Sequence, residues 1–151
     1  MKKISIVVIV FMFLTSFAFA ADRGTQKEAQ AMVKKAVAFL KANGKDNAFA
    51  EFSNSKGKFV DKDLYIWVLD AKKKGLVLVH EANAKLVGQD MIDLKDADGK
   101  PFIKEIISGA ESKGSGWVDY KWTHPVSKKV EAKTTYFEKV GDFIVLCGAY
   151  K

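Results

Sequence analysis

The apolar residues of this chain change their spacing part of the way along it, and that change decides which folds are open to it. After residue 25, apolar side chains recur every three or four positions, which is the period of an amphipathic helix. From residue 64 onward, short aromatic and β-branched runs separated by turn residues take over, as is typical of strands. The helical positions are Ala29, Met32, Val33, Ala36, Val37 and Leu40.

Turn and capping residues place the predicted elements. Thr25 followed by Glu28 has the spacing of a capping box, and Asn43-Gly44 is a helix ending, with a short second helix expected over residues 46–52. Strands are expected over residues 64–69 and 76–80, and a further helix after Pro101. Three more strands follow at 117–122, 130–140 and 143–150, the last two joined by the two-residue turn Gly141-Asp142.

This order predicts one α+β domain. A long N-terminal helix and a helical crossover between the second and third strands pack on a five-stranded antiparallel sheet. We find no internal repeat and no linker in the sequence.

The first twenty residues are predicted to be a signal peptide. Lys2 and Lys3 precede an apolar run over residues 4–17, and Ala18-Phe19-Ala20 supplies the small-residue cleavage pattern. The mature domain is then residues 21–151, periplasmic or secreted. The alternative is an uncleaved membrane anchor.

Composition excludes several classes of function. Cys147 is the one cysteine, so no internal disulfide can form, and we expect a buried thiol. The lysines are scattered among acids, which argues against a nucleic-acid partner. With two histidines and no catalytic or phosphate-binding motif, we predict no enzyme, no metal site and no cofactor. A calcium-loop pattern lacks its first ligand at Leu94, so residues 94–105 are interpreted as a turn.

Several separated motifs together resemble the single Cache domain (type 2), the PAS-like extracytoplasmic sensor of chemoreceptors and sensor kinases. The matching stretches are Tyr65-Ile66-Trp67, the strand ending in His80, residues 88–102, Trp117 to Trp122 with Pro125, Lys133 with Tyr136, and the terminal Gly148-Ala149-Tyr150.

The resemblance implies a ligand pocket between the sheet and residues 88–102, and a small organic anion such as a short carboxylate as ligand. Two departures concern the ligand. Glu81 stands where the family often has proline, and Pro101 where receptors often carry a basic residue. Because the chain stops at Lys151, we expect any sensing to pass through a membrane receptor or sensor kinase. The alternative is an interaction module docking on such a partner, with a vestigial pocket.

Seven residues are candidates for ligand binding. The alternatives are ordinary core packing for the aromatic ones, a partly buried structural histidine for His80 and an exposed strand lysine for Lys133. Strand alternation puts Lys133 and Tyr136 on opposite faces, so one of the two is expected to point inward. His124 is expected to be solvated in the Pro125 turn. The candidates are Tyr65, Trp67, His80, Tyr120, Trp122, Lys133 and Tyr136.

Overall fold

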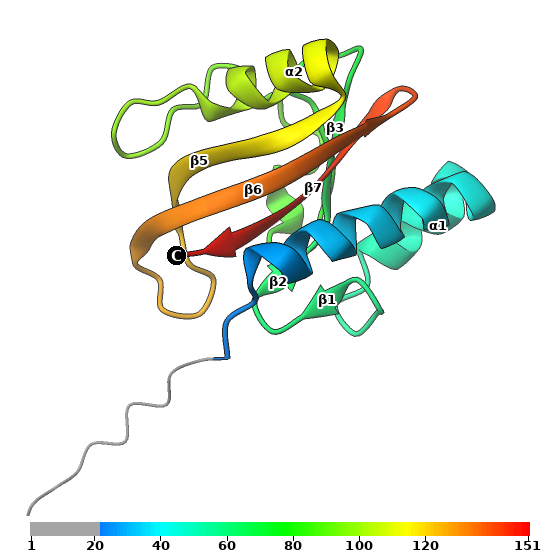
Figure 1. The fold of residues 1–151 in the computed structure, drawn as a ribbon, viewed down its shortest axis with the longest axis horizontal. Coiled ribbons are helices and arrows are strands. Elements are labelled where there is room, and N and C mark those ends of the chain that lie inside the picture. Colours follow the sequence, from blue (N-terminus) through cyan, green and yellow to red (C-terminus); the bar gives the residue numbers. More distant parts are fainter. Residues whose placement is uncertain (1–21) are drawn as a thin grey trace, which may run out of the picture.

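Two helices lie on opposite faces of a five-stranded sheet in the computed structural model, which describes residues 22–151 (Figure 1). The predicted signal peptide, residues 1–20, lies outside the described residues. The α+β class with a long N-terminal helix is confirmed, and the connectivity of the sheet is PAS-like.

The first helix, α1 (Gln26–Phe52), begins at the predicted capping box. The backbone N–H of Glu28 donates to Thr25 Oγ1 at 3.2 Å, and the Glu28 carboxylate accepts from the Thr25 backbone N–H at 2.7 Å. Gly44 has φ 77° and ψ 169°, a conformation that favours glycine, and it bends the helix there. The expected break and second short helix are therefore present as one bent helix.

The main sheet is antiparallel throughout, with strand order β4-β3-β7-β6-β5. Its strands are β3 (Trp67–Asp70), β4 (Val77–His80), β5 (Ser115–Thr123), β6 (Val130–Val140) and β7 (Phe143–Tyr150). The turn at Gly141, where φ is 56°, joins β6 to β7 as predicted.

The predicted first strand, residues 64–69, is divided in two. β2 (Leu64–Tyr65) pairs with an unpredicted strand, β1 (Val60–Asp61), in a separate ribbon, while β3 belongs to the main sheet. Local patterning shows an apolar run but does not show that its two halves pair with different strands.

The crossover from β4 to β5 contains one turn of 3₁₀ helix, η1 (Ala84–Leu86), and then α2 (Phe102–Lys113). Pro101 precedes the first turn of α2, as expected, and Gly114 ends the helix with φ 78°. Within the crossover, the Asp96 carboxylate accepts backbone hydrogen bonds from Asp98 and Lys100 at 2.9 and 2.8 Å. Residues 96–100 are therefore a turn held by its own aspartate.

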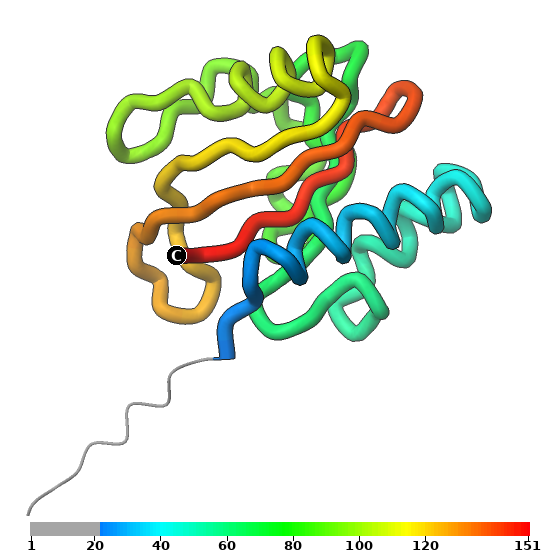
Figure 2. Tube along the Cα trace, viewed as in Figure 1, coloured from blue at the N-terminus to red at the C-terminus, as the bar shows by residue number. Residues whose placement is uncertain are grey.

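Alternation along the strands divides the interior into two cores. The α1 core lies between α1 and one face of the sheet, and the α2 core lies between the other face and the crossover with α2 (Figure 2). The α1 core includes Val33, Leu40, Phe52, Val145 and Cys147, and the α2 core includes Tyr65, Trp67, Phe102, Tyr120 and Leu146.

Candidate functional site

Five of the seven predicted ligand-binding residues line one small hollow in the α2 core. They project from β2, β3, β4 and β5: Tyr65, Trp67, His80, Tyr120 and Trp122. Met91 and Phe102 close the hollow from the crossover and the first turn of α2. The sheet and two residues of the 88–102 stretch therefore enclose five of the predicted side chains.

The hollow itself is nearly filled, with a volume of about 10 Å³. The rings of Phe102 and Tyr120 stack with their centroids 4.1 Å apart and an interplanar angle of 8°. The Trp122 ring packs edge-on against Phe102 at 5.6 Å. This corrects the expectation of a pocket with room for a ligand, because such a space is barely large enough for one water molecule.

An open cleft of about 420 Å³ lies next to this hollow and shares Tyr65, His80 and Trp122 with it. The other walls of the cleft come from the start of the crossover and from the β5–β6 turn, and include Asn83, Leu86, Thr123, His124 and Lys128. A second groove, of about 550 Å³, runs along residues 86–94 and again includes Trp122. The half-buried Trp122 side chain is thus a wall of all three spaces.

Lys133 points to the same side of the sheet, and only 2% of it is exposed. Its Nζ donates to Tyr65 Oη at 3.0 Å and to Tyr150 Oη at 3.4 Å. It also lies 4.7 and 4.5 Å from the centroids of these two rings. Within residues 22–151, no carboxylate forms an ion pair with this ammonium, although burial of a charge is costly without one.

The stem of Lys133 lies over Gly148 on the neighbouring strand. A Cβ atom at position 148 would come within 2.2 Å of Lys133 Cε and 2.5 Å of Thr135 Oγ1. The glycine of the terminal Gly-x-Tyr motif therefore makes room for the lysine, and the tyrosine of the same motif, Tyr150, receives its ammonium.

His80 is held as a neutral ring. Burial and, to a smaller extent, the nearby Lys133 charge lower its pKa from 6.5 to about 4. Its Nδ1 accepts a hydrogen bond from the backbone N–H of Asn83 at 3.1 Å. The neutral ring must then carry its proton on Nε2, so it can donate a hydrogen bond.

The tyrosine hydroxyls around Lys133 are also protonated. Burial raises the pKa of Tyr65 and Tyr120, and raises that of Tyr150 to about 12. Tyr150 donates to the Thr123 carbonyl at 2.9 Å, and the Tyr120 hydroxyl lies 2.8 Å from Thr135 Oγ1. The group at Lys133 is therefore one cation surrounded by neutral hydroxyl and imidazole donors.

Tyr136 is the predicted site residue that the structure does not bring to this group. It lies in the α1 core, where its ring packs 5.1 Å from that of Trp117. Strand alternation explains this, because Lys133 and Tyr136 are three positions apart on β6. Of the two, Lys133 is the one on the α2 side of the sheet, beside Tyr65.

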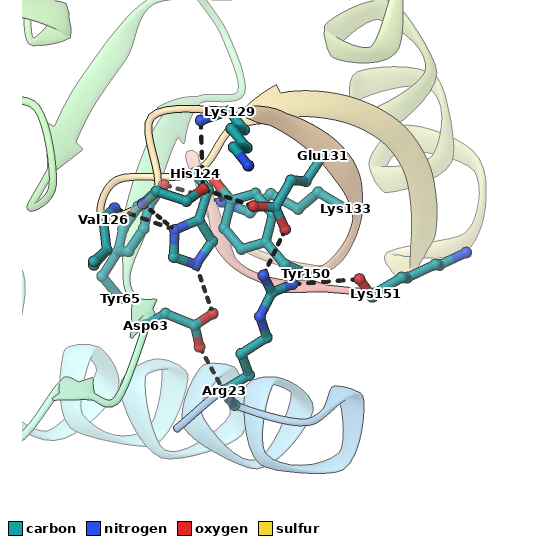
Figure 3. Close-up of polar contacts among 12 residues, drawn as sticks. Arg23, Asp63, Tyr65, His124, Val126, Lys129, Glu131, Lys133, Tyr150 and Lys151 are labelled. Carbon is teal, nitrogen blue, oxygen red and sulfur yellow. Dashed lines mark hydrogen bonds and ion pairs between the residues drawn. The ribbon is translucent and has the colours of Figure 1, made fainter. Parts of the chain in front are cut away.

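The expectation that His124 is solvated is wrong, since only 1% of it is exposed. Its Nε2 lies 3.3 Å from Asp63 Oδ2, and the other carboxylate oxygen of Asp63 accepts from the backbone N–H of Gly24 (Figure 3). Its Nδ1 accepts from the backbone N–H groups of Val126 and Ser127, at 3.1 Å each, which fixes the turn that forms one wall of the cleft. Nothing near residue 124 in the sequence points to a partner at residue 63.

Sequence reasoning also missed Tyr150, Met91 and Phe102 as site residues. Tyr150 had a signal, because a two-residue turn at 141–142 pairs it directly with Lys133. Met91 and Phe102 had none beyond their place in the crossover. In the described part of the chain, no three His, Cys, Asp or Glu side chains gather as metal ligands would.

Chemically, the group can recognise an anion but offers no catalytic arrangement. A carboxylate placed beside Lys133 would receive charge-assisted hydrogen bonds, and the surrounding aromatic rings would hold a short apolar tail. The nucleophilic candidate nearby, Cys147, is buried on the opposite face in the α1 core, and burial raises its pKa to about 12.

Comparison with known proteins places this fold in one class, the sensor domains called Cache. The family model described as "Single Cache domain 2" matches residues 7–151, and the chain belongs to that family. It is a Cache chemosensory ligand-binding domain, and the family is one of sensors rather than enzymes.

Relatives are chemoreceptors. The chain is 34% identical over 92 residues, or 60% of its length, to methyl-accepting chemotaxis protein McpP of Pseudomonas putida, and spans 16% of that receptor. A solved structure described as showing the structural basis for carboxylic acid recognition by a Cache chemosensory domain is 26% identical to this chain, with a TM-score of 0.63. The match covers 82% of this chain and 86% of that one. A methyl-accepting chemotaxis protein of Vibrio parahaemolyticus shares the fold, with 22% identity and a TM-score of 0.70 over 82% and 86% of the two chains.

Within residues 22–151, none of the helices has the length and apolar character that crossing a bilayer requires.

Proposed function

We propose that residues 21–151 form an exported sensor domain that binds a small organic acid, with the ligand carboxylate at Lys133. In this proposal residues 1–20 are a signal peptide, and the domain works in the periplasm or outside the cell. The observation that carries the proposal is the Lys133 ammonium, which is buried among hydroxyl groups and aromatic rings and is not paired with a carboxylate of residues 22–151.

Binding would supply the anion that this charge lacks. Two of the three ammonium protons are directed at the hydroxyls of Tyr65 and Tyr150, and a carboxylate would take the third or displace one of these hydroxyls. Tyr65 and His80 reach both the hollow and the open cleft. Both can donate to the same carboxylate, since each is neutral and protonated.

The filled hollow means that the ligand must displace protein side chains. The Tyr120 hydroxyl is hydrogen-bonded to Thr135 and the Trp67 side chain is buried on β3, so neither side chain can move out of the hollow. The half-buried Trp122 borders the open cleft, and Met91 has a flexible unbranched side chain. We therefore assign the movement that admits the ligand to these two residues.

The small space limits both ligand size and affinity. A ligand of about four heavy atoms, at no better than about −1.5 kcal/mol per atom, reaches roughly −6 kcal/mol, which corresponds to tens of micromolar. A short monocarboxylic acid is the candidate of this size. Carboxylic acid recognition by a related Cache domain supports this ligand class.

The bound state would be read by a membrane receptor or sensor kinase. The similarity of the chain to a methyl-accepting chemotaxis protein supports a role in chemotaxis or a related signal transduction pathway.

The test is a thermal-shift and calorimetric screen against short carboxylic acids, with amino acids and amines as comparison sets. A ligand at about 100 times its dissociation constant should add ~2.7 kcal/mol of stability, a rise of several degrees in Tm. Amines of the same size should give no shift. A flat response to every acid would refute the proposal.

A second candidate is an interaction module whose hollow no longer admits a ligand, and the 10 Å³ volume is the observation that favours it. In that case the domain would bind a membrane receptor or kinase with the same affinity in the absence and presence of acids. A pull-down from membranes with and without the acid panel separates the two candidates.

A further inference from the structure

The outward face of α1 carries a row of lysines, which the ligand site does not use. Lys27, Lys34 and Lys41 repeat every seven residues, with Lys35 and Lys45 beside them, and all five are exposed. We call these five residues the α1 lysine face. Seven residues span about 10.5 Å along a helix, so the three repeating lysines form a line along α1.

Little negative charge lies beside the three repeating lysines, although Asp46 follows Lys45 and Asp61 lines a hollow together with Lys35. Between Gln26 and Lys45 the one acidic residue is Glu28, which is occupied by the capping box and by Lys62 at 2.8 Å. Within residues 22–151, none of the five lysines forms an ion pair. The exposed side chains between the lysines are small, at Ala31, Ala38 and Ala42.

The chemistry of the face favours an extended anionic surface over a structured partner. Lysine is a compact charge on a flexible stem and does not impose a fixed geometry, whereas arginine does. Lys45 Nζ lies 5.8 Å from the centroid of the Phe49 ring. Among residues 22–151, no hydrogen bond or ion pair fixes the other four ammonium groups in one position, as specific recognition of a protein would require. A second copy of this chain is disfavoured, since a two-fold contact through α1 would set lysines against lysines.

We propose that the α1 lysine face docks the domain on an anionic lipid surface. Each lysine near such a surface contributes about fivefold to partitioning. The face has no large apolar side chain to insert into a bilayer, so this contact is electrostatic and weakens with salt. α1 and α2 lie on opposite faces of the sheet (Figure 1). Tyr65 and Trp122, two walls of the open cleft, belong to the α2 side, so docking through α1 leaves the cleft open to solutes.

The experiment measures co-sedimentation of the full chain with vesicles of phosphatidylcholine alone and with 30% phosphatidylglycerol. Because residues 4–17 are apolar and can themselves enter bilayers, the readout is the ratio of binding to the two vesicle types. The variant K27E/K34E/K41E should lower that ratio on the order of a hundredfold. Added salt should lower it for the wild type.

The matched control is K73E/K95E/K139E, which changes the net charge equally at three exposed lysines outside α1. This variant should keep most of the lipid preference. In the wild type, binding to vesicles should slow acylation of the lysines on α1 but not of Lys73, Lys95 and Lys139. If both triple variants lose the preference equally, or if the wild type shows none, the proposal is overturned. Binding of a soluble acidic peptide without a lipid preference would also overturn it and assign the face to an acidic protein.

Discussion

Replacing Lys133 with methionine removes the ammonium and keeps a stem of similar length. In the free protein this deletes two hydrogen bonds to hydroxyls, worth roughly 1.5 kcal/mol each, and two contacts with ring faces. It also removes the desolvation penalty of a buried charge, which is several kcal/mol. The two sums are close, so the unfolding free energy of the free variant should stay within about 1 kcal/mol of wild type.

Ligand binding should respond very differently. Loss of charge-assisted hydrogen bonds to a carboxylate costs about 3 kcal/mol, or roughly a hundredfold in Kd. Calorimetry measures the affinity for the acid found in the screen, and urea unfolding without ligand measures the stability. The variant should therefore separate the two quantities, with affinity lost and stability kept.

Lys139→Met is the control, because Lys139 is on the same strand but exposed, and it should leave both quantities unchanged. Two results would refute the reasoning. If Lys133→Met binds the acid as well as wild type does, the carboxylate is not at Lys133. If the free variant loses several kcal/mol of stability, the ammonium is a structural element and its burial is no sign of a missing anion.

Further variants test other parts of the site. Trp122→Ala should join the hollow to the cleft and raise the affinity for longer acids, by about 0.8 kcal/mol for each methylene that becomes buried, as measured by calorimetry across a chain-length series. Because His80 has a pKa of about 4 in the folded state against 6.5 ordinarily, the unfolded state binds more protons between these values, so stability should fall by about 3 kcal/mol at most as pH drops from 6.5 to 4. Urea unfolding against pH should show this slope, and His80→Gln should remove it. Gly148→Ala should cost about 1–3 kcal/mol in wild type but less in a Lys133→Ala background, and a double-mutant cycle without coupling would contradict the contact between them. Asp63→Asn replaces the carboxylate that accepts hydrogen bonds from Gly24 and His124 with an amide and should cost about 1.5–3 kcal/mol in urea unfolding, whereas a neutral result would show that these contacts are dispensable.

The parts of the fold and site that the sequence predicts well are those set by short-range rules. The two-residue turn at Gly141-Asp142 pairs Val140 with Phe143 and so fixes the register of the whole β6–β7 hairpin. Counting back from the turn places Lys133 opposite Tyr150. Strand alternation separates Lys133 from Tyr136 by face. The capping box and the helix-ending Gly114 follow from equally local chemistry.

The parts that could not be predicted depend on contacts between distant segments. His124 is buried because Asp63 reaches it from a hairpin 61 positions earlier, and neither residue has a local sign of the other. The division of residues 64–69 between two sheets has the same origin. The volume of the hollow could not be predicted either. The sequence indicates that aromatic rings converge there but not how much space they leave, and Phe102 and Tyr120 stack and leave almost none.

Among the described residues, the two cores lie on opposite faces of the sheet, and this separates two kinds of evolutionary change. Side chains on the α2 side can be exchanged to suit a new chemical signal, while those under α1 continue to hold the strands in place. Lineages of such domains can therefore diversify in what they detect without first acquiring surplus stability. A library confined to alternate positions of β5, β6 and β7 would sample new specificities on an unchanged scaffold.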